Sequence, residues 1–326
     1  MIRFVARRLL WAIPTLIIVT FLVYVAIRLG TNPVAAYRRS NARASKAKII
    51  QYEKKNGLDL NYVQGYLNWA KQFVQGKWAR SIKGNREVWP NLKRALANSI
   101  VLGGVASAVG VSIGLGVGIF AALRPGSKRD TGITTASFIG VSVPPYVTAI
   151  ILQLLFAVTL PRLFGLDKPI LPTSGIYPAG HFGFDLILRI KYLLLPVIVV
   201  SIQVVAAYSR YMRASLLEVV NNDYLRTARA KGISERRVLV KHMLRNAMIP
   251  IVTLIALEAG GILSGLIITE NLFQYPGAGV YFIKALGDGD FPLIMPWMVF
   301  VTLAVVVFNL LADLSYAWLD PRIRLD

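Results

Sequence analysis

The sequence lacks several residue types on which enzymes and metalloproteins depend. Its 326 residues include no cysteine, which excludes disulfide bonds, thiolate catalysis and cysteine-ligated metals. The two histidines, His181 and His242, lie too far apart in sequence to suggest a shared site. The phosphate-binding pattern GxxxxGK[ST] is absent, and no clustered nucleophile or acid/base pair is found. We therefore expect no catalytic residue, no metal site and no cofactor on this chain.

Acidic residues are also scarce. Asp and Glu number 16 against 37 Lys and Arg, which gives a net charge of +21. At the same time, 55% of the residues are hydrophobic and only 16% are charged. This balance is too apolar for a soluble domain of such length and indicates a polytopic membrane protein. Binding to nucleic acid is the alternative explanation of the positive charge.

Six apolar runs have about the 17 to 25 residues that a helix needs to cross a hydrocarbon core of roughly 30 Å. They cover residues 9–29, 97–123, 137–160, 192–212, 247–269 and 293–314. The sequence thus predicts an all-α polytopic membrane protein with six transmembrane helices. Arginines precede the first run, as in a secretory signal, but the run exceeds the usual length of about 7 to 15 residues. We expect residues 1–30 to form an uncleaved anchor.

The distribution of Lys and Arg predicts the orientation, because short cytoplasmic connections carry the positive excess. Connections on the side of the two termini contain seventeen Lys and Arg, nine of them between Arg210 and Arg245. The short connections on the other side contain five. We expect both termini in the cytoplasm, including a tail at 319–326.

The long segment 31–95 is the exception, with fourteen Lys and Arg against three acidic residues on the outer side. The positive-inside rule applies to short loops, and this segment, at about 65 residues, is too long for it. Apolar and aromatic residues recur among polar ones, with breaks at Gly57 and Gly76, which predicts a small helical subdomain. It is either a solvated cap or a docking face for an acidic partner. For the second function we single out Lys46, Lys48, Lys54 and Lys55.

Small residues within the runs predict close helix packing. Glycines that repeat every four residues share one helix face, on which another backbone can approach. They are Gly110, Gly114 and Gly118 in the second run, and Gly261 and Gly265 in the fifth. In the third run, Pro144 and Pro145 predict a kink whose freed carbonyls must be satisfied by neighbours or water.

Three carboxylates lie in or near the last two runs: Glu258, Glu270 and Asp313. A charge at mid-membrane costs about 2.5 to 3.5 kcal/mol, so such a group faces the bundle interior or water by default. We predict that these residues belong to a translocation pathway, and for Glu258 the alternative is a protonated or hydrogen-bonded side chain that pins two helices. A proton-coupled carrier would need more groups of this kind.

Residues 213–247 form the longest predicted cytoplasmic connection. Apolar residues at helical spacing between Leu216 and Ala228 predict a first helix. Gly232 fits its left-handed end, and Ser234 with Glu235 fits the cap and acidic first turn of a second helix. A DNA-binding motif has this outline, but the flanking membrane spans leave no room for a recognition helix. Either this elbow is a solvated loop, or its apolar face docks in a groove of a partner.

Several stretches, in order along nearly the whole chain, resemble the B-type permease subunits of ABC importers for oligopeptides, dipeptides and nickel. They are FVARRLLWAIPTLIIVTFLVYVAIRL (4–29), LPTSG (171–175), YLRTARAKGISERRVLVKHMLRNAMIP (224–250), ENLFQYPGAG (270–279), DFPLI (290–294) and NLLADLSYAWLDPRIR (309–324). Two departures stand out. Arg226 and Thr227 occupy positions where the general importer motif has Glu and Ala, and GTNP replaces a Pro-Gly-Asp-Pro turn after the first run.

The resemblance implies a type I ABC importer permease fold, with a core at 96–318 in a prokaryotic inner membrane. It implies that the 216–235 helix couples this core to a cytoplasmic ATPase. The residues implied at that contact are Tyr224, Leu225, Arg226, Thr227, Ala228, Arg229, Ala230, Lys231, Gly232, Ile233 and Ser234.

The resemblance also implies the partners and the cargo. The partners are a homologous second permease, two ATP-binding subunits that carry ATP and Mg, an extracytoplasmic substrate-binding protein and membrane lipid. Nucleic acid is not expected. The implied cargo is oligopeptides or dipeptides, while nickel or another small solute, or ATP-independent secondary transport, remain alternatives.

Overall fold

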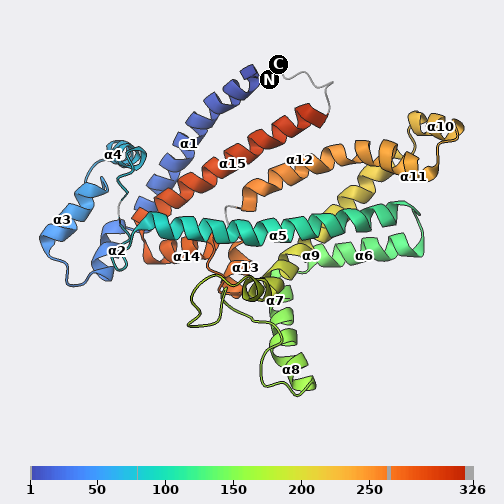
Figure 1. The fold of residues 1–326 in the computed structure, drawn as a ribbon. Helices are drawn as coiled ribbons and strands as arrows, with labels where there is room; N and C mark the ends of the chain where they lie inside the picture. Colours follow the sequence, from blue (N-terminus) through green and yellow to red (C-terminus); the bar gives the residue numbers. More distant parts are fainter. Residues whose placement is uncertain (1, 79, 263–265, 320–326) are drawn as a thin grey trace.

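A computed structural model of the chain describes residues 2–78, 80–262 and 266–319 (Figure 1). Every regular element in these ranges is a helix. Six stretches are long and apolar enough to cross a membrane: Ala6–Gly30, Val88–Ala122, Pro145–Leu163, Leu186–Val219, Glu235–Ile262 and Phe291–Leu314. The predicted all-α fold with six transmembrane helices is thereby confirmed.

Two helices extend well beyond the predicted runs. Helix α5 (Val88–Ala122) has 35 residues and α9 (Leu186–Val219) has 34. At about 1.5 Å per residue each is roughly 50 Å long, which exceeds a hydrocarbon core of about 30 Å. The apolar run marks only the membrane part, and flanking polar residues continue the same helix. Helix α5 therefore begins inside the predicted subdomain 31–95.

One end of the bundle is covered by three short helices (Figure 1). They are α2 (Pro33–Ser40), α3 (Lys46–Lys55) and α4 (Tyr62–Val74). We call this end, residues 31–87, the cap end. Hydrogen bonds attach it to α1 (Ile2–Gly30): the hydroxyls of Thr20 and Tyr66 lie 2.8 Å apart, and Arg28 donates to the carbonyl of Leu58 at 2.8 Å.

The opposite end, residues 220–243, is called the loop end. It carries α10 (Asp223–Ala230), α11 (Glu235–Arg237) and the π-helix η2 (Val238–Met243). From there α12 (Leu244–Ile262) runs back along the bundle and packs against α15 (Phe291–Leu319), which also contacts α1. Two short helices, α13 (Ile267–Leu272) and α14 (Ala278–Asp288), lie toward the cap end (Figure 1).

The third predicted span, 137–160, is divided into two helices at the kink that Pro144 and Pro145 predict. Helix α6 (Lys128–Ser142) stops before Pro144, and α7 (Pro145–Leu154) turns steeply away from it (Figure 1). The π-helix η1 (Leu155–Thr159) and α8 (Leu160–Leu163) complete this arm. Proline cannot donate to the carbonyl four residues earlier, and here the Gln203 side chain donates instead to Gly140 at 2.9 Å. The predicted kink is therefore present, and a neighbouring side chain hydrogen-bonds the carbonyl that the kink frees, as predicted.

Helices α5 and α9 form the axis that joins the two ends. A Cβ built at Gly110 would lie 2.6 Å from Val204 Cβ, and one at Gly114 would lie 2.9 Å from Tyr208 Cβ. At Gly118 it would meet the carbonyl oxygen of Ser209 at 2.5 Å. The three glycines thus face α9, and no larger residue fits without separating the helices.

In the glycine pair predicted in the fifth run, Gly261 and Gly265, the described member, Gly261, does not show the same close contact. A Cβ at Gly261 would meet no atom within 4 Å, whereas one at Gly260 would lie 3.2 Å from Phe308 Cβ on α15. The close contact with α15 is thus made at Gly260, and the packing of Gly261 stays a prediction. The four-residue spacing shows that two glycines share a face but not which face meets a neighbour. Gly265 lies outside the described residues.

Candidate functional site

The loop end forms a tight elbow between two helical segments. Gly232 has a φ of +73°, as its predicted left-handed position requires. The backbone N–H of Ile233 donates to Ala228 at 3.3 Å and that of Gly232 to Arg229 at 2.9 Å, which closes the end of α10. These bonds fix the direction in which the chain leaves the helix.

The start of the second helix differs from the prediction. The Ser234 side chain makes no capping hydrogen bond, although the Ser234 carbonyl accepts from Arg237 at 2.8 Å. Glu235 instead accepts from Arg229 Nε at 2.8 Å, so an ion pair bridges the elbow. Both side chains are largely exposed, and a pair of this kind contributes little stability. It links α10 to the start of α11 across the turn.

The apolar face of α10 turns inward. Leu225 and Ala228 are buried, and they pack with Leu216, Val238 and Met243 in a cluster below the elbow. A partner cannot reach these side chains, so the prediction that this face seats in a partner's groove is wrong. The predicted helical spacing was correct, but the buried surface is supplied by the chain's own helices.

The surface that α10 and the turn offer to a partner is polar and basic. Among the predicted contact residues, Ile233 is half-buried. Those that are exposed are Tyr224, Arg226, Thr227, Arg229, Ala230, Lys231, Gly232 and Ser234. Such a surface suits an acidic groove better than an apolar one.

Two hydrogen bonds connect the elbow and its flanking helices. Asn246 Nδ2 donates to the hydroxyl of Tyr224 at 2.8 Å, which ties α10 to α12. Ser215 Oγ donates to the carbonyl of Ala247 at 2.8 Å, which ties α9 to α12. A displacement of α10 would therefore be transmitted to both long helices.

A partly buried ion pair between α6 and α9 was not predicted from the sequence. Arg213 on α9 donates to both carboxylate oxygens of Asp130 on α6, at 2.5 and 2.7 Å, and Gly126 N donates at 2.9 Å. The Arg213 hydrogen bond is the main cause that lowers the pKa of Asp130 to about 2. The partners are 83 residues apart in sequence, so no local pattern could reveal them.

The three predicted pathway carboxylates do not come together. Glu258 is exposed on α12 and accepts from the Tyr208 hydroxyl at 2.8 Å. Asp313 forms an ion pair with Arg8 at 2.9 Å, which joins the end of α15 to the start of α1. Of the three, only Glu258 is exposed, and it lies within the apolar stretch Glu235–Ile262.

Glu270 has a structural position, and the pathway prediction for it is wrong. Its side chain is fully buried and accepts from Ser99 Oγ at 2.5 Å, Gly279 N at 2.8 Å and Val280 N at 3.2 Å. A Cβ at Gly277 would collide with the carboxylate. The carboxyl oxygens at this place satisfy the free N–H groups at the start of α14.

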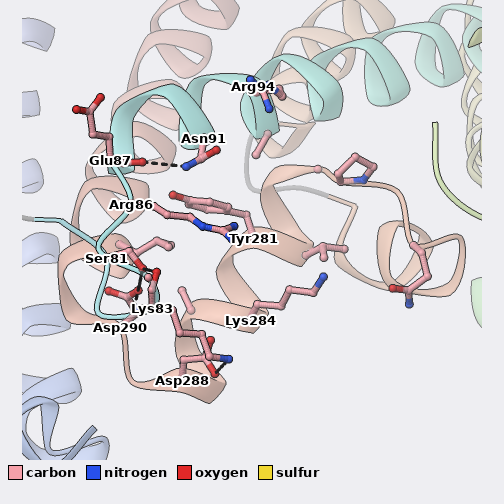
Figure 2. Close-up of a pocket in the computed structure, with 18 residues that line it drawn as sticks. Ser81, Lys83, Arg86, Glu87, Asn91, Arg94, Tyr281, Lys284, Asp288 and Asp290 are labelled. Carbon is pink, nitrogen blue, oxygen red and sulfur yellow. Dashed lines mark hydrogen bonds and ion pairs between the residues drawn. The ribbon is translucent and has the colours of Figure 1, made fainter. Parts of the chain in front are cut away.

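The cap end contains a cavity of about 610 Å³ between the 81–95 stretch and α14 (Figure 2). Arg86 reaches across it beside Tyr281, and Arg94 on α5 and Lys284 on α14 line it from two helices. Lys83 pairs with Asp288 at 2.7 Å. In the described part of the chain, no group of three His, Asp or Glu is placed to hold a metal ion.

Comparison with known proteins places these features in a family. Residues 114–325 match the family described as binding-protein-dependent transport system inner membrane component. Over 99% of this chain, 36% of residues are identical to the oligopeptide transport system permease protein AppB of Bacillus subtilis, covering 100% of it. The dipeptide transport system permease protein DppB of Escherichia coli K12 is 32% identical, with 99% of both chains covered.

A solved structure supports the fold. The inward-facing MetNI methionine ABC transporter aligns with a TM-score of 0.54 and 15% identity, over 70% of this chain and 96% of that chain. The molecule is therefore a transmembrane permease subunit with the fold of ABC importer permeases and no catalytic role of its own. It belongs to the family of inner membrane components of binding-protein-dependent transport systems.

Proposed function

We propose that this chain is one of two permease subunits in an ATP-driven importer of oligopeptides or dipeptides. The observation that carries the proposal is the full-length similarity, at 32 to 36% identity, to permeases named for these cargoes. The cargo is assigned by those relatives, because no described residue of this chain identifies a peptide by itself.

The proposed importer has four further components. They are a homologous second permease, two ATP-binding subunits that carry ATP and Mg, and a substrate-binding protein on the outer side. The loop end would lie in the cytoplasm and the cap end outside. This orientation is supported by the seventeen Lys and Arg on the side of the termini against five in the short opposite connections.

Coupling would occur through the exposed surface of α10 and the turn to Ser234. Closure of the ATP-binding subunits would displace this surface. The Tyr224–Asn246 and Ser215–Ala247 bonds would then carry the motion into α9 and α12. Because the apolar face of α10 is packed inward, the elbow would move as one body with these helices rather than bend separately.

Glu258 remains the candidate for the translocation pathway. A carboxylate exposed at membrane level is costly against lipid, so it would face water or the second permease. The Tyr208 hydroxyl at 2.8 Å would fix its orientation. Asp313 is the weaker candidate, since Arg8 already neutralises it at the far end of α15.

Reconstitution tests the proposal directly. The complete complex in proteoliposomes should import a labelled dipeptide or oligopeptide only with ATP inside and the binding protein outside. Uptake driven by an ion gradient, with this chain alone, would contradict the ATP-driven function. Uptake of nickel but of no peptide would contradict the cargo while leaving the importer function intact.

A further inference from the structure

Helices α5, α6 and α9 enclose an apolar groove of about 400 Å³. Helix α6 packs against both of the longer helices and lies alongside α5 (Figure 1). Some lining side chains are exposed, so the groove opens on the side of the bundle. We call it the α6 groove, and its lining from α5 and α6 is Val109, Ile113, Val117, Ile133, Ala136, Ser137 and Gly140, with α9 contributing residues between Val197 and Ala206.

The α6 groove offers no hydrogen bond from a side chain that lacks one. Ser137 Oγ donates to the carbonyl of Ile133 at 2.8 Å and lies 2.8 Å from Ser209 Oγ. Ser201 Oγ donates to the carbonyl of Ala106 at 3.0 Å. The other lining side chains are apolar. A polar occupant would therefore lose its hydrogen bonds to water, whereas a hydrocarbon chain would lose nothing.

The length and depth of the α6 groove match one leaflet of a bilayer. Along α5 its lining runs from Val109 to Val117, which is about 12 Å. Half of a hydrocarbon core of about 30 Å is similar. Val109 lies near the middle of the apolar run 97–123, and Val117 lies nearer the loop end. The groove thus occupies the half of the membrane on the side of the loop end.

A cation lies at the loop end of the α6 groove. Phe120 follows Val117 by one turn of α5, and the Arg129 guanidinium carbon lies 5.5 Å from the centre of the Phe120 ring. Arg129 precedes Ile133 by four residues on α6, so the two side chains share a helix face. Within the described ranges, no ion pair involves Arg129. The groove therefore ends at a positive charge without a carboxylate partner.

The residue next to Arg129 fixes this end of α6. Asp130 accepts from both Arg213 on α9 and the backbone N–H of Gly126, and Ser127 Oγ accepts from the backbone N–H of Asp130 at 3.3 Å. The first turn of α6 is thereby attached to α9. The position of Arg129 relative to the groove is set by this framework.

We propose that the α6 groove binds one anionic phospholipid, with an acyl chain along the groove and its phosphate at Arg129. An apolar groove that ends at a basic residue matches the two parts of such a molecule. A volume of 400 Å³ spread over about 12 Å gives a cross-section of about 33 Å², whereas a helix about 10 Å wide needs about 80 Å². A single chain fits, and a helix of the second permease does not.

This inference rests on the proposed function only for the orientation, which places Arg129 at the cytoplasmic leaflet. It depends on neither ATP nor cargo. Lipid binding is therefore measured without ATP, peptide or binding protein. A wrong cargo would leave the result unaffected, and a failed lipid site would leave peptide import unaffected.

The experiment uses the complete complex in proteoliposomes of phosphatidylcholine and phosphatidylglycerol. Two photoactivatable probes are compared, a phosphatidylglycerol and a phosphatidylcholine with identical chains, each with a diazirine near the end of one chain. After irradiation, mass spectrometry of the digested permease measures how strongly each probe labels the peptides that line the α6 groove.

Two pairs of variants separate the groove from its surroundings. Ala136→Trp fills the groove, and Thr135→Trp places the same side chain at the neighbouring exposed position, which does not line it. Arg129→Gln removes the cation at the end of the groove, and Lys128→Gln removes the exposed cation on another face of α6. Assembly of each complex is checked by size-exclusion chromatography.

In the wild type, the phosphatidylglycerol probe should label the groove more strongly than the phosphatidylcholine probe. Ala136→Trp should remove most of the groove labelling by both probes, because the indole occupies the space of the chain. Arg129→Gln should lower the ratio of the two probes about fivefold, as expected for one basic residue that contacts an anionic lipid. The Thr135→Trp and Lys128→Gln complexes should stay close to the wild type.

Groove labelling that is unchanged in Ala136→Trp would overturn the lipid site, as would equal labelling by the two probes in the wild type. A wild-type complex in which neither probe labels the groove would show that the second permease covers it, which also overturns the proposal. If Ala136→Trp does not assemble, the probe ratio in Arg129→Gln decides: an unchanged ratio contradicts the site.

Discussion

The two ends of the bundle are both rich in basic residues, but they use them differently. At the loop end, apolar side chains of the short helix α10 are buried beneath the elbow, and the cations lie on its exposed surface. At the cap end, cations from separate elements line a concave cavity. An exposed charged surface suits contact with a large partner, whereas a concave one suits capture of a single group. Net charge alone therefore does not show whether basic residues lie on an exposed surface or line a cavity.

The largest effect is expected on the α5–α9 axis that connects the ends. Gly114→Leu should destabilise the protein by about 3 kcal/mol or more, because its side chain would enter the backbone of α9. Gly116→Leu is the matched control, since a Cβ there meets nothing within 4 Å. Thermal unfolding in detergent and the yield of assembled complex would measure this. Equal loss in both variants would contradict the packing.

Next in size is the partly buried Arg213–Asp130 ion pair between α9 and α6. Asp130→Asn should lower the free energy of unfolding by about 2 kcal/mol, because Asp130 is 4% exposed and Arg213, which is 29% exposed, loses its charge partner. Removing the exposed Arg229–Glu235 pair should cost less than about 1 kcal/mol. Unfolding free energies that are equal for the two pairs would show that burial does not set their strength.

The same pair predicts a pH dependence. The folded-state pKa of Asp130, about 2, lies below its unfolded value of about 3.9. Its contribution is therefore complete above that unfolded value and is lost as the pH falls toward 2. The stability difference between wild type and Asp130→Asn should shrink over this window. A difference that stays constant down to pH 2.5 would contradict the ion pair.

A smaller effect is expected for Glu270, the corresponding buried carboxylate toward the cap end. Glu270→Gln keeps the shape but replaces one of the two acceptor oxygens by a donor NH2, and should lower the free energy of unfolding by about 1 to 2 kcal/mol. Transport per folded complex should stay near the wild-type rate, since the group faces no open path. A specific loss of transport without loss of stability would restore a pathway role for Glu270.

Much of the fold follows from sequence because lipid imposes simple demands. Apolar length predicts the spans, and Pro144 and Pro145 predict the break in the third. The elbow also follows, since Gly232 is suited to a left-handed helix end. Helix ends were less predictable, because polar residues prolong α5 and α9 beyond the membrane core.

Side-chain direction and long-range contacts could not be predicted in the same way. Helical spacing shows that Leu225 and Ala228 share a face but not that α9 and η2 cover it. Glu270 lies in an apolar region of the sequence. Its hydrogen-bond donors, however, come from α14 and from Ser99, which is 171 residues earlier. The cap-end cavity likewise joins stretches separated by more than 150 residues, so it exists only in three dimensions.

The most direct test of the account is whether the elbow transmits ATP-driven motion. Gly232→Pro removes its left-handed conformation and the N–H bond to Arg229, and Gly165→Pro does the same at a loop with φ +65° and an N–H bond to Arg162. With the complete complex in proteoliposomes, we expect peptide uptake per ATP hydrolysed to fall at least about tenfold for Gly232→Pro and to stay unchanged for Gly165→Pro. Wild-type uptake per ATP in the assembled Gly232→Pro complex would contradict the coupling role of the loop end.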